Sequence, residues 1–383
     1  MTVCFVSHSP RGGGAERSLV ETMRALRERG VECVALLPGT GWLAHELERR
    51  SFAYHVLPYK TWTAVEGGAA WRRGARSGWN LAMAVRAAAW IRRRSARIVY
   101  TNAITTGVGA FAARLAALPH VWHIRELGHE HNRMVYDLGE RLSLRLVRSL
   151  SALCLANSEC VAAKYRERLR PTEIRVVYQG VRLDDGSSAP DVPVAHGFRC
   201  VAVGAIGPAK RQEEAIEAVA RLNGRGLATE LLIVGEGDRA YGERLRGLVD
   251  RLGAGACVSF LGELESAARV IRSADAVVTC SRHEAFGRVT VEGMLAGKPV
   301  VGARSAGTAE LIRDGETGFL YEPGDVQQLE GILRRLIEDP AERRRVGETA
   351  RAWAVKRFDE RRFGDEILAC LLPLDERGAT APA

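Results

Sequence analysis

Short apolar runs alternate with longer segments of helical periodicity along the whole sequence, and this rhythm limits the possible fold more than any other feature. In the first half it predicts a helix over Ala15–Arg29, which ends at Gly30. The predicted strands lie at Val3–Val6, Val31–Leu37, Arg97–Thr101, Val121–Ile124, Leu153–Ala156 and Ile174–Tyr178. Strands that alternate with helices in this way indicate an α/β fold with a doubly wound parallel sheet.

A second alternating series follows Leu183–Gly197, a segment rich in Asp, Ser, Pro and Gly that is typical of a linker. Its predicted strands lie at Arg199–Val203, Glu230–Val234, Val258–Leu261, Ala276–Thr279 and Pro299–Val301. We therefore expect two Rossmann-like domains, over residues 1–182 and 198–354, with a C-terminal helix at about 355–375 that completes the first. Such sheets bind ligands outside the carboxyl ends of their strands, which we expect to face each other across a cleft.

Positive charge is concentrated in the first 150 residues, which carry 22 Arg and Lys against 11 Asp and Glu, whereas the whole chain carries a net charge of +9. An anionic partner is one explanation, and a solvated Arg-rich surface is the other. Within Ala69–Arg97, Trp71, Trp79 and Trp90 are interleaved with Arg. This pattern is compatible with docking on an anionic membrane surface, or with an ordinary helix that has a wet basic face.

The eight cysteines form no Cys-x-x-Cys pair, and most lie beside or within apolar runs. Such cysteines usually act as small buried side chains, so neither a zinc site nor a disulfide framework is indicated. The N-terminal sequence MTVCFVSHSP has no signal-peptide pattern, and no apolar run has the length of a membrane span. We expect a cytoplasmic protein, peripheral on the inner face of the membrane if the Trp and Arg segment docks there.

The segment with the most chemistry follows the predicted strand that ends near Cys280, and reads TCSRHEAFGRVTVEGMLAGK over Thr279–Lys298. Gly287 stands directly before a predicted helix, where backbone N–H groups can approach a phosphate closely. Glu284 and Glu292 flank that helix start, and carboxylates accept hydrogen bonds from the hydroxyl pairs of sugars. The alternative is one Glu that favours the helix dipole and one ordinary surface Glu.

This segment resembles the Glu-x7-Glu motif of glycosyltransferase family 4, also described as glycosyl transferases group 1. The matching residues are Ser281, Glu284, Phe286, Gly287, Glu292, Met294, Gly297, Pro299, Val300 and Val301, and Gly307–Leu311 and Asp314–Leu320 match as well. The resemblance covers nearly the whole chain. It implies a GT-B fold with two Rossmann-like domains that bind a nucleotide-sugar between them, and transfer with retention at the anomeric carbon.

The resemblance also implies roles for single residues. Glu292 would hold the ribose hydroxyls, Glu284 would be a catalytic residue that contacts the donor sugar, and backbone amides of Phe286, Gly287 and Arg288 would bind the pyrophosphate. Lys210 matches the phosphate-binding lysine of the family. Gly235 and Gly237 resemble its Gly-x-Gly turn near the base and pyrophosphate, although any tight turn has this pattern.

One position departs from the family. Many members have an Arg after the glycine that ends the first strand of the second domain, and this chain has Ala205 there. The pair of cations on the phosphates is therefore incomplete, and Arg211, Arg282 and Arg288 are the alternatives for the second cation.

The glycine-rich segment Ser9–Glu16 opens the first helix of the chain. It lacks the G-x-G-x-x-G spacing and the Lys-Ser/Thr of a P-loop, which argues against a dinucleotide site and an NTPase. By the resemblance, Gly13 and Gly14 would approach the donor phosphate and Glu16 would border the acceptor. A tight turn without a ligand is the alternative.

The segment HVWHIRELGHEHNR holds four histidines, but His129 and His131 do not have the spacing of a metal motif. By the resemblance, His123 would be a catalytic residue at a strand end, near the acceptor hydroxyl and the donor sugar. Arg125 and Glu126 would shape the acceptor pocket together with Asn102. The sequence has no Asp-x-Asp motif suited to Mg²⁺, so we expect neither a metal nor a cofactor.

The expected reaction moves a hexose-type sugar from a nucleoside-diphosphate sugar to a hydroxyl of a saccharide, a lipid-linked saccharide or a natural product. A nucleotide-sugar epimerase of the same architecture is one alternative. A basic nucleic-acid-binding protein is another, but it would leave the Glu pair without a role, so we expect no nucleic-acid partner.

Overall fold

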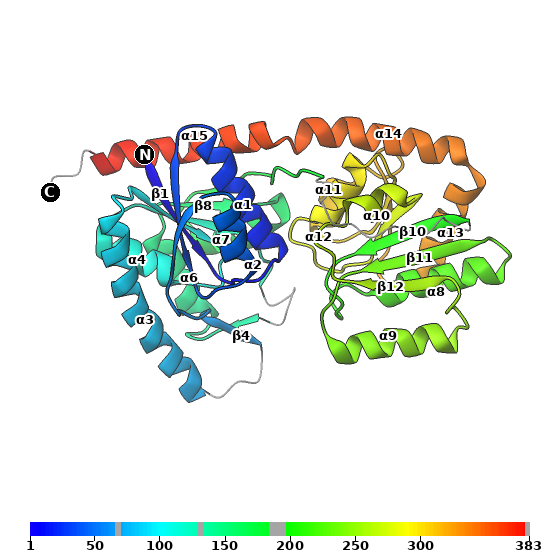
Figure 1. Cartoon of the computed structure of the whole chain (residues 1–383), viewed down its shortest axis with the longest axis horizontal. Helices are drawn as coiled ribbons and strands as arrows, with labels where there is room; N and C mark the ends of the chain where they lie inside the picture. The colour runs from blue at the N-terminus through cyan, green and yellow to red at the C-terminus, as the bar shows by residue number, and fades with distance from the viewer. Residues whose placement is uncertain (66–69, 129–133, 184–196, 380–383) are drawn as a thin grey trace. The chain divides into compact units, whose positions relative to one another are not determined.

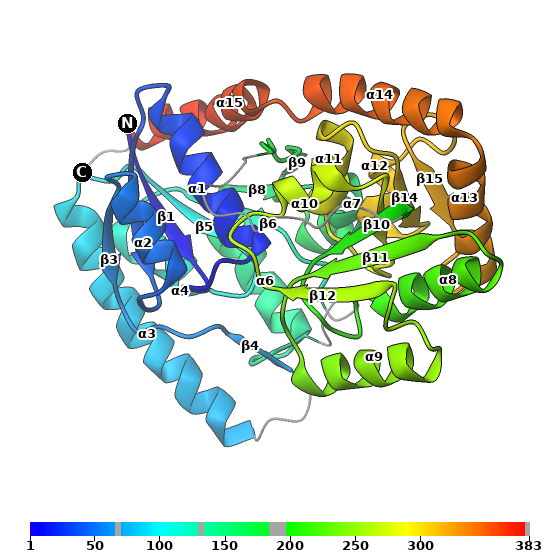
Figure 2. The ribbon, with the colours of Figure 1, turned by 45° about the vertical axis from the view of Figure 1, so that its right-hand side comes forward.

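The computed structural model describes residues 1–65, 70–128, 134–183 and 197–379. Contacts divide the chain into two units, Met1–Gly180 with Glu360–Ala383, and Val181–Asp359. Each unit is a parallel sheet with helices on both faces (Figures 1 and 2), which confirms the predicted α/β class. Residues 184–196 of the expected linker lie outside the described residues.

The sheet of the first unit is built from seven strands. These are β1 (Thr2–Ser7), β2 (Glu32–Leu37), β3 (Ala53–Val56), β5 (Ile98–Asn102), β6 (His120–Ile124), β8 (Leu153–Ala156) and β9 (Ile174–Val176). They lie in the order β3-β2-β1-β5-β6-β8-β9, and every neighbouring pair is parallel. A separate antiparallel pair is formed by β4 (Thr63–Val65) and β7 (Met134–Tyr136).

Two apolar layers cover this sheet, because successive strand residues point to opposite faces. On one face, Phe5 and Tyr100 pack with α1 (Gly14–Arg27), α2 (Trp42–Arg49) and the C-terminal α15 (Glu360–Ala379). On the other, Cys4 and Val6 pack with α3 (Ala70–Arg93) and α4 (Val108–Ala116). The helices α6 (Glu140–Leu150) and α7 (Glu159–Leu169) precede and follow β8.

The sheet of the second unit has six parallel strands in the order β12-β11-β10-β13-β14-β15. They are β10 (Phe198–Val203), β11 (Thr229–Val234), β12 (Val258–Gly262), β13 (Ala276–Thr279), β14 (Val300–Ala303) and β15 (Phe319–Tyr321). The helices are α8 (Gln212–Gly224), α9 (Arg239–Arg251), α10 (Ala268–Ser273), α11 (Arg288–Leu295), α12 (Ala306–Leu311), α13 (Val326–Glu338) and α14 (Pro340–Arg357). One core cluster joins α8, α9 and α13 to the sheet.

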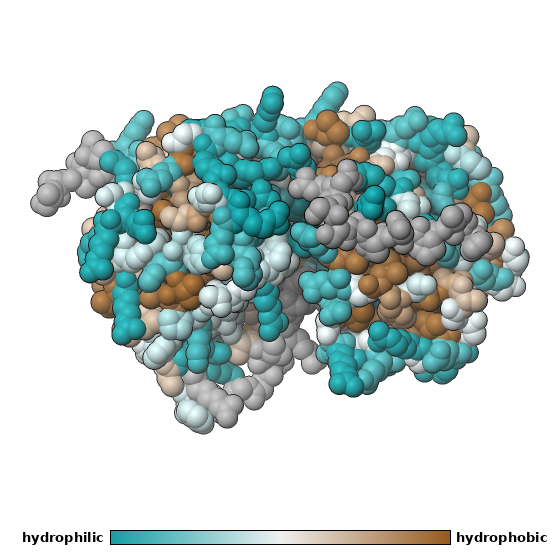
Figure 3. Space-filling model, viewed as in Figure 1, coloured by the Kyte–Doolittle hydropathy of each residue, from teal (hydrophilic) through white to brown (hydrophobic). Residues whose placement is uncertain are grey.

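The edge of the second sheet carries apolar surface. Phe260 and Cys257 are only partly buried against the core, and apolar residues gather over β11 and β12 in the space-filling view (Figure 3). None of the eight cysteines, all of which lie among the described residues, forms a disulfide. Among the described residues, no helix combines the length and the apolar composition needed to cross a membrane.

Candidate active site

Both sheets reverse their strand order once, and ligands of doubly wound sheets bind at such switch points. In the first unit the reversal lies between β1 and β5, where Ser7 is the register partner of Asn102, which in turn faces His123 on β6. In the second unit it lies between β10 and β13. The predicted site residues lie near the carboxyl ends of the strands of these two sheets, in the strands themselves, in the loops that follow them or in the helices α1 and α11 that those loops lead into.

His123, the last residue but one of β6, contacts two hydrogen-bond donors on one side of its ring. The hydroxyl of Tyr100 and Nη2 of Arg125, the latter at 3.1 Å, both contact Nδ1. His123 is fully buried, and burial followed by the positive charge of Arg125 lowers its pKa well below 6.5. The imidazole is therefore neutral, and its Nε2 has no hydrogen-bond partner among the described residues.

Arg125 is a buried cation held by neutral partners. Its Nε donates to Oδ1 of Asn102 at 2.7 Å, and its Nη1 donates to Oε1 of Gln179 at 2.9 Å. Burial lowers the pKa of Arg125, while Tyr100 and nearby carboxylates oppose that shift. The structure thus brings together three predicted residues, His123, Arg125 and Asn102.

Tyr100 and Gln179 belong to this network but escaped the sequence analysis. Gln179 follows β9 and is 1% exposed, so a polar residue directly after a short strand was the available signal. Tyr100 lies in an apolar strand and has the appearance of an ordinary core aromatic, so its sequence context offered no signal.

Glu126 anchors the loop that follows β5. Its Oε2 accepts hydrogen bonds from the backbone N–H groups of Ile104 and Arg125, each at 3.1 Å. The adjacent Ala103 has a φ of 146°, a conformation that favours glycine, and its carbonyl accepts from Nε1 of Trp122 at 2.7 Å. Glu126 therefore holds a strained loop in place, and a contact of Glu126 with an acceptor stays a prediction.

The start of α1 joins a glycine segment to a buried carboxyl group. Glu16 is 3% exposed, and burial raises its pKa to about 7. Its Oε1 lies 3.2 Å from Nδ1 of His8, whose pKa burial lowers to about 4. Between these values both groups are neutral, so the contact is not a salt bridge, and neither of these two atoms has a hydrogen-bond partner among the described residues.

The two predicted glycines of this loop differ in their surroundings. A Cβ on Gly13, the N-cap of α1, would lie 2.8 Å from Oε2 of Glu16, whereas a Cβ on Gly14 would meet nothing within 4 Å. Gly13 has no side chain that could cap this helix start. The carboxyl group of Glu16 accepts from the backbone of Gly13 and of Glu16 itself, which leaves the amides of Gly14 and Ala15 as the ones suited to an anion.

Several buried polar atoms near this edge have no protein partner among the described residues. They lie after β5, within β6 and after β8, and comprise Thr105 Oγ1, Thr106 Oγ1, His123 Nε2 and Asn157 Oδ1. Buried polar groups are nearly always paired in folded proteins, so such a group indicates a ligand or water. The strand ends of the first unit thus offer both donors and acceptors to a polar molecule.

The switch point of the second unit is spanned by an ion pair. Nζ of Lys210, in the loop after β10, contacts Oε1 of Glu284, in the loop after β13. The two loops are also joined by the backbone, because the N–H of Arg282 donates to the carbonyl of Ala209 at 3.3 Å. Two of the predicted site residues, 74 positions apart in sequence, are therefore neighbours.

The helix α11 begins beside this pair. Its N-cap, Gly287, has a φ of 91°, which glycine adopts without strain, and no side chain caps the helix. Nε of Arg288 donates to Oε1 of Glu292 one turn later, at 2.8 Å. Phe286 is 6% exposed and its ring packs on Phe358, so the backbone of Phe286 remains the part suited to a ligand.

Packing of the backbone accounts for the predicted Gly-x-Gly turn. A Cβ on Gly235 would overlap the carbonyl oxygen of Gly204, and a Cβ on Gly237 would overlap that of Ile206. Both glycines therefore let the loop after β11 lie against the loop after β10. Their contact with a donor stays a prediction.

The three candidates for the second cation beside Ala205 have different surroundings. Arg211 contacts Glu214 and Arg288 contacts Glu292, so both guanidinium groups are engaged. Arg282 is exposed and lies in the loop that is hydrogen-bonded to Ala209. The geometry favours Arg282.

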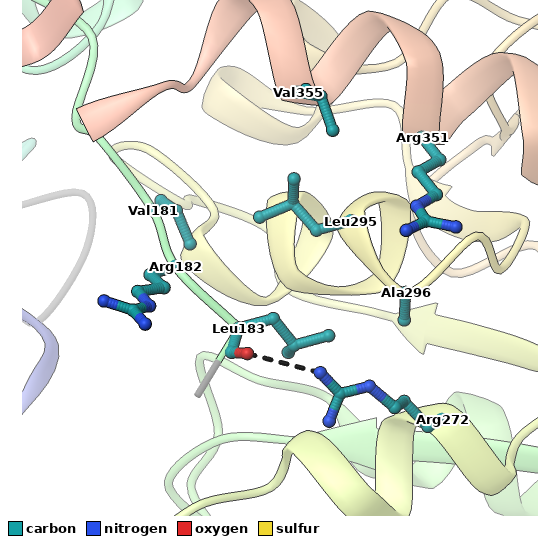
Figure 4. A pocket seen from close by; sticks show the side chains of 8 residues that line it. All are labelled: Val181, Arg182, Leu183, Arg272, Leu295, Ala296, Arg351 and Val355. Carbon is teal, nitrogen blue, oxygen red and sulfur yellow. Dashed lines mark hydrogen bonds between the residues drawn. The ribbon is translucent and has the colours of Figure 1, made fainter. Parts of the chain in front are cut away.

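A cavity of about 450 Å³ lies in the second unit, at the C-terminal end of α11 (Figure 4), and none of the predicted site residues lines it. Its lining comprises Val181, Arg182, Leu183, Arg272, Leu295, Ala296, Arg351 and Val355. Arg272 donates across it to the carbonyl of Leu183 at 3.3 Å. His129 and His131, considered above as metal ligands, lie outside the described residues, and no group of three potential metal ligands occurs among those described.

Two parallel doubly wound units, each with polar loops at its switch point, define the GT-B class of glycosyltransferases. Two family models match the chain: Glycosyltransferase Family 4 over residues 12–185, and Glycosyl transferases group 1 over residues 197–353. The chain belongs to this family of GT-B glycosyltransferases, as the resemblance implied.

Individual relatives agree with this assignment. The lipopolysaccharide core biosynthesis glycosyltransferase LpsE of Rhizobium meliloti is 27% identical, over 95% of this chain and 97% of its own. The putative glycosyltransferase EpsD of Bacillus subtilis is 34% identical over 45% of this chain and 46% of its own. Anabaena HepE in complex with UDP-glucose superposes with a TM-score of 0.80 at 26% identity, over 97% of this chain and 100% of HepE.

Proposed function

We propose that this enzyme transfers a sugar from a UDP-sugar to a hydroxyl group of a growing surface saccharide, with retention at the anomeric carbon. The observation that carries the proposal is the Lys210–Glu284 pair beside the uncapped start of α11. The choice of nucleotide is supported by the complexes of HepE with UDP and UDP-glucose. The acceptor class is supported by LpsE and LpsD, two lipopolysaccharide core glycosyltransferases of Rhizobium meliloti.

The second unit holds the donor in this proposal. The diphosphate lies on the N-terminal amides of α11, where the helix dipole favours negative charge, and takes Lys210 as its counter-ion. Glu284, released from Lys210, accepts from hydroxyls of the sugar. Glu292 accepts from the ribose hydroxyls.

The first unit contributes the groups around the acceptor. Thr105, Thr106, His123 and Asn157 each present a buried polar atom without a partner among the described residues. A saccharide carries many hydroxyl groups that both donate and accept, so it can pair donors and acceptors that lie side by side. Glu16 near its protonation point can do either.

The step forms one bond and breaks one. The acceptor oxygen bonds to the anomeric carbon while the bond from that carbon to the β-phosphate oxygen breaks, and the acceptor proton passes to that leaving oxygen. Lys210 and the dipole of α11 offset the charge that develops on the diphosphate. We propose that no metal takes part, so EDTA leaves turnover unchanged, and restoration of lost activity by Mg²⁺ would contradict this.

The helix α3 is proposed to contact an anionic membrane surface. Trp71 is 72% exposed, Leu81 55% and Val85 56%, which is unusual for large apolar side chains. Arg86, Arg92 and Arg93 are exposed beside them. Sedimentation with vesicles rich in anionic lipid should carry the protein down at low salt, and Leu81→Glu with Val85→Glu should weaken this; no sedimentation would reject the contact.

The donor is tested by thermal shift with UDP-, GDP- and ADP-glucose, because a ligand that binds the folded state raises the melting temperature. We expect a shift with UDP-glucose, no shift in Glu292→Gln, and an unchanged shift in Glu243→Gln, which alters an exposed carboxylate on α9. A shift of equal size in Glu292→Gln would remove this residue from the donor site. A shift in melting temperature with GDP-glucose alone would reject UDP as the nucleotide of the donor.

A further inference from the structure

The contacts of Nδ1 determine where His123 carries its proton. A guanidinium group donates hydrogen bonds and cannot accept them, so Nδ1, which lies 3.1 Å from Nη2 of Arg125, must be the acceptor. The hydroxyl of Tyr100 approaches the same nitrogen. A neutral imidazole that accepts at Nδ1 carries its hydrogen on Nε2.

The orientation of Arg125 is fixed in turn by two amide side chains. The Nδ2 group of Asn102 donates to the carbonyl of Ala15 at 2.8 Å, and Nε2 of Gln179 donates to Oε2 of Glu21 at 3.2 Å. Each amide therefore turns its oxygen to Arg125. Because Nε of Arg125 donates to Asn102 and its Nη1 donates to Gln179, the third nitrogen, Nη2, is the one that contacts His123.

We propose that Arg125 is a positioning residue that holds His123 as the Nε2–H tautomer, so that His123 donates a hydrogen bond to a substrate oxygen and does not act as a base. Nε2 is buried and has no partner among the described residues, as a group reserved for substrate would. The substrate assignment rests on the proposed function, whereas the tautomer itself does not. The proton of the acceptor must then leave by way of the phosphate.

The tautomer can be read without turnover. Long-range proton–nitrogen spectra of the full-length protein, labelled with ¹⁵N in its histidines, distinguish a protonated Nε2 from a protonated Nδ1, and comparison with His123→Gln assigns the signal. We expect Nε2–H in the wild type and a mixture of tautomers in Arg125→Met. A protonated Nδ1 in the wild type, or a pure Nε2–H form in Arg125→Met, would overturn the proposal.

Steady-state kinetics distinguish a positioning role of Arg125 from a purely structural one. We expect Arg125→Met to lower kcat about tenfold or more while KM for the donor changes less than about threefold, because the lost contact acts on the reacting centre. Arg125→Lys, which keeps the charge but not the fork of donors, should resemble Arg125→Met. An Arg125→Lys enzyme with wild-type kcat overturns the proposal, even if Arg125→Met fails to fold.

Failure of the two proposals is distinguishable. If no nucleotide-sugar binds and His123 still shows Nε2–H, the proposed function fails and the tautomer stands. If UDP-glucose is used and His123 shows Nδ1–H, the function stands and this inference fails. A pH profile of kcat/KM that follows a histidine base would also overturn it.

Discussion

At the scale of single residues, Glu16 makes stability depend on pH. Its pKa is raised from 4.5 to about 7 by burial, so the folded state keeps a proton that the unfolded chain releases. The contribution of Glu16 to the free energy of unfolding should therefore fall as pH rises from 4.5 to about 7, whereas His8, whose pKa is lowered to about 4, contributes in the opposite direction up to pH 6.5. Glu16→Gln should remove this fall and stabilise the protein by roughly 2–3 kcal/mol above neutral pH.

Urea unfolding of both proteins across this pH range measures the effect. Glu28→Gln is the matched control, because Glu28 is exposed at the other end of the same helix. An identical pH dependence in wild type and Glu16→Gln would show that Glu16 ionises as it does in water.

Arg282 should supply the cation that Ala205 does not. Arg282→Ala should weaken binding of a UDP-sugar about tenfold, since a charge-assisted contact to phosphate is lost. Arg251→Ala, which removes an exposed Arg at the end of α9, is the control and should bind normally. Isothermal titration measures the affinity of each variant for the UDP-sugar. If Arg282→Ala bound as tightly as Arg251→Ala, Arg211 and Arg288 would remain as the candidates for the second cation.

Which site residues the sequence could reveal depends on where they lie. His123 and Asn102 lie at the carboxyl ends of buried neighbouring strands of the first sheet, and such ends meet at one edge, so their grouping could be foreseen. Lys210 and Glu284 follow neighbouring strands of the second sheet, and the same reasoning applies to them. Tyr100 and Gln179 could not be assigned, because their role comes from hydrogen bonds across strands 23 and 54 positions from their partners. The engagement of Arg288 by Glu292 likewise depends on side-chain geometry.

At the scale of elements, a substitution of Gly14, the first residue of α1, can test ligand binding without disturbing the fold. A Cβ there meets nothing within 4 Å, so Gly14→Ala should leave the free energy of unfolding unchanged or raise it by up to about 1 kcal/mol. If a phosphate approaches this helix start, kcat/KM should nevertheless fall. Thermal unfolding and initial rates measure the two effects, and unaltered rates would place the phosphate elsewhere.

Gly235→Ala provides the contrasting case. Its φ is 131° and its Cβ would overlap the carbonyl oxygen of Gly204, so the fold itself should be destabilised. Loss of activity in this variant should follow loss of structure, whereas in Gly14→Ala the two should separate.

Most of the strands that the sequence revealed are buried on both faces, whereas β9 and β12, which it also revealed, are partly exposed. β1, β5 and β8 are buried at every position, and their apolar runs made them recognisable. β3 is an edge strand with alternating exposure, and β4, β7 and β15 have three residues each, too few for a periodicity. These four were missed for that reason. β9 is as short, but the longer apolar run Ile174–Tyr178 that contains it made it recognisable.

At the scale of the whole molecule, α15 joins the end of the described chain to the first unit. Phe363, Ile367 and Leu371 are buried in the core that α1 forms with its sheet, and Arg24, Arg29 and Arg97 contact Glu360, Asp365 and Asp375. Phe363→Ala should therefore destabilise the first unit by about 3–5 kcal/mol, the range for a buried aromatic.

Hydrogen exchange with mass spectrometry can follow the two units separately. We expect faster exchange in peptides of β1 and α1 in Phe363→Ala, with the peptides of β10 and α8 unchanged. Leu372→Ala, which alters an exposed residue on the same helix, should exchange like the wild type. Equally faster exchange in both units would contradict the expectation that α15 stabilises the first unit alone.

The position of α15 in the sequence determines the order in which the two units can complete their folding during synthesis. The residues that complete the first core are translated after the whole of the second unit, so the sheet that begins the chain waits for the helix at its far end. During synthesis, the half that is made first is the half that finishes folding last. A chain interrupted after the second unit would keep the proposed donor loops but leave exposed the part of its N-terminal sheet and of α1 that α15 covers, and we expect chaperones and proteases to recognise it.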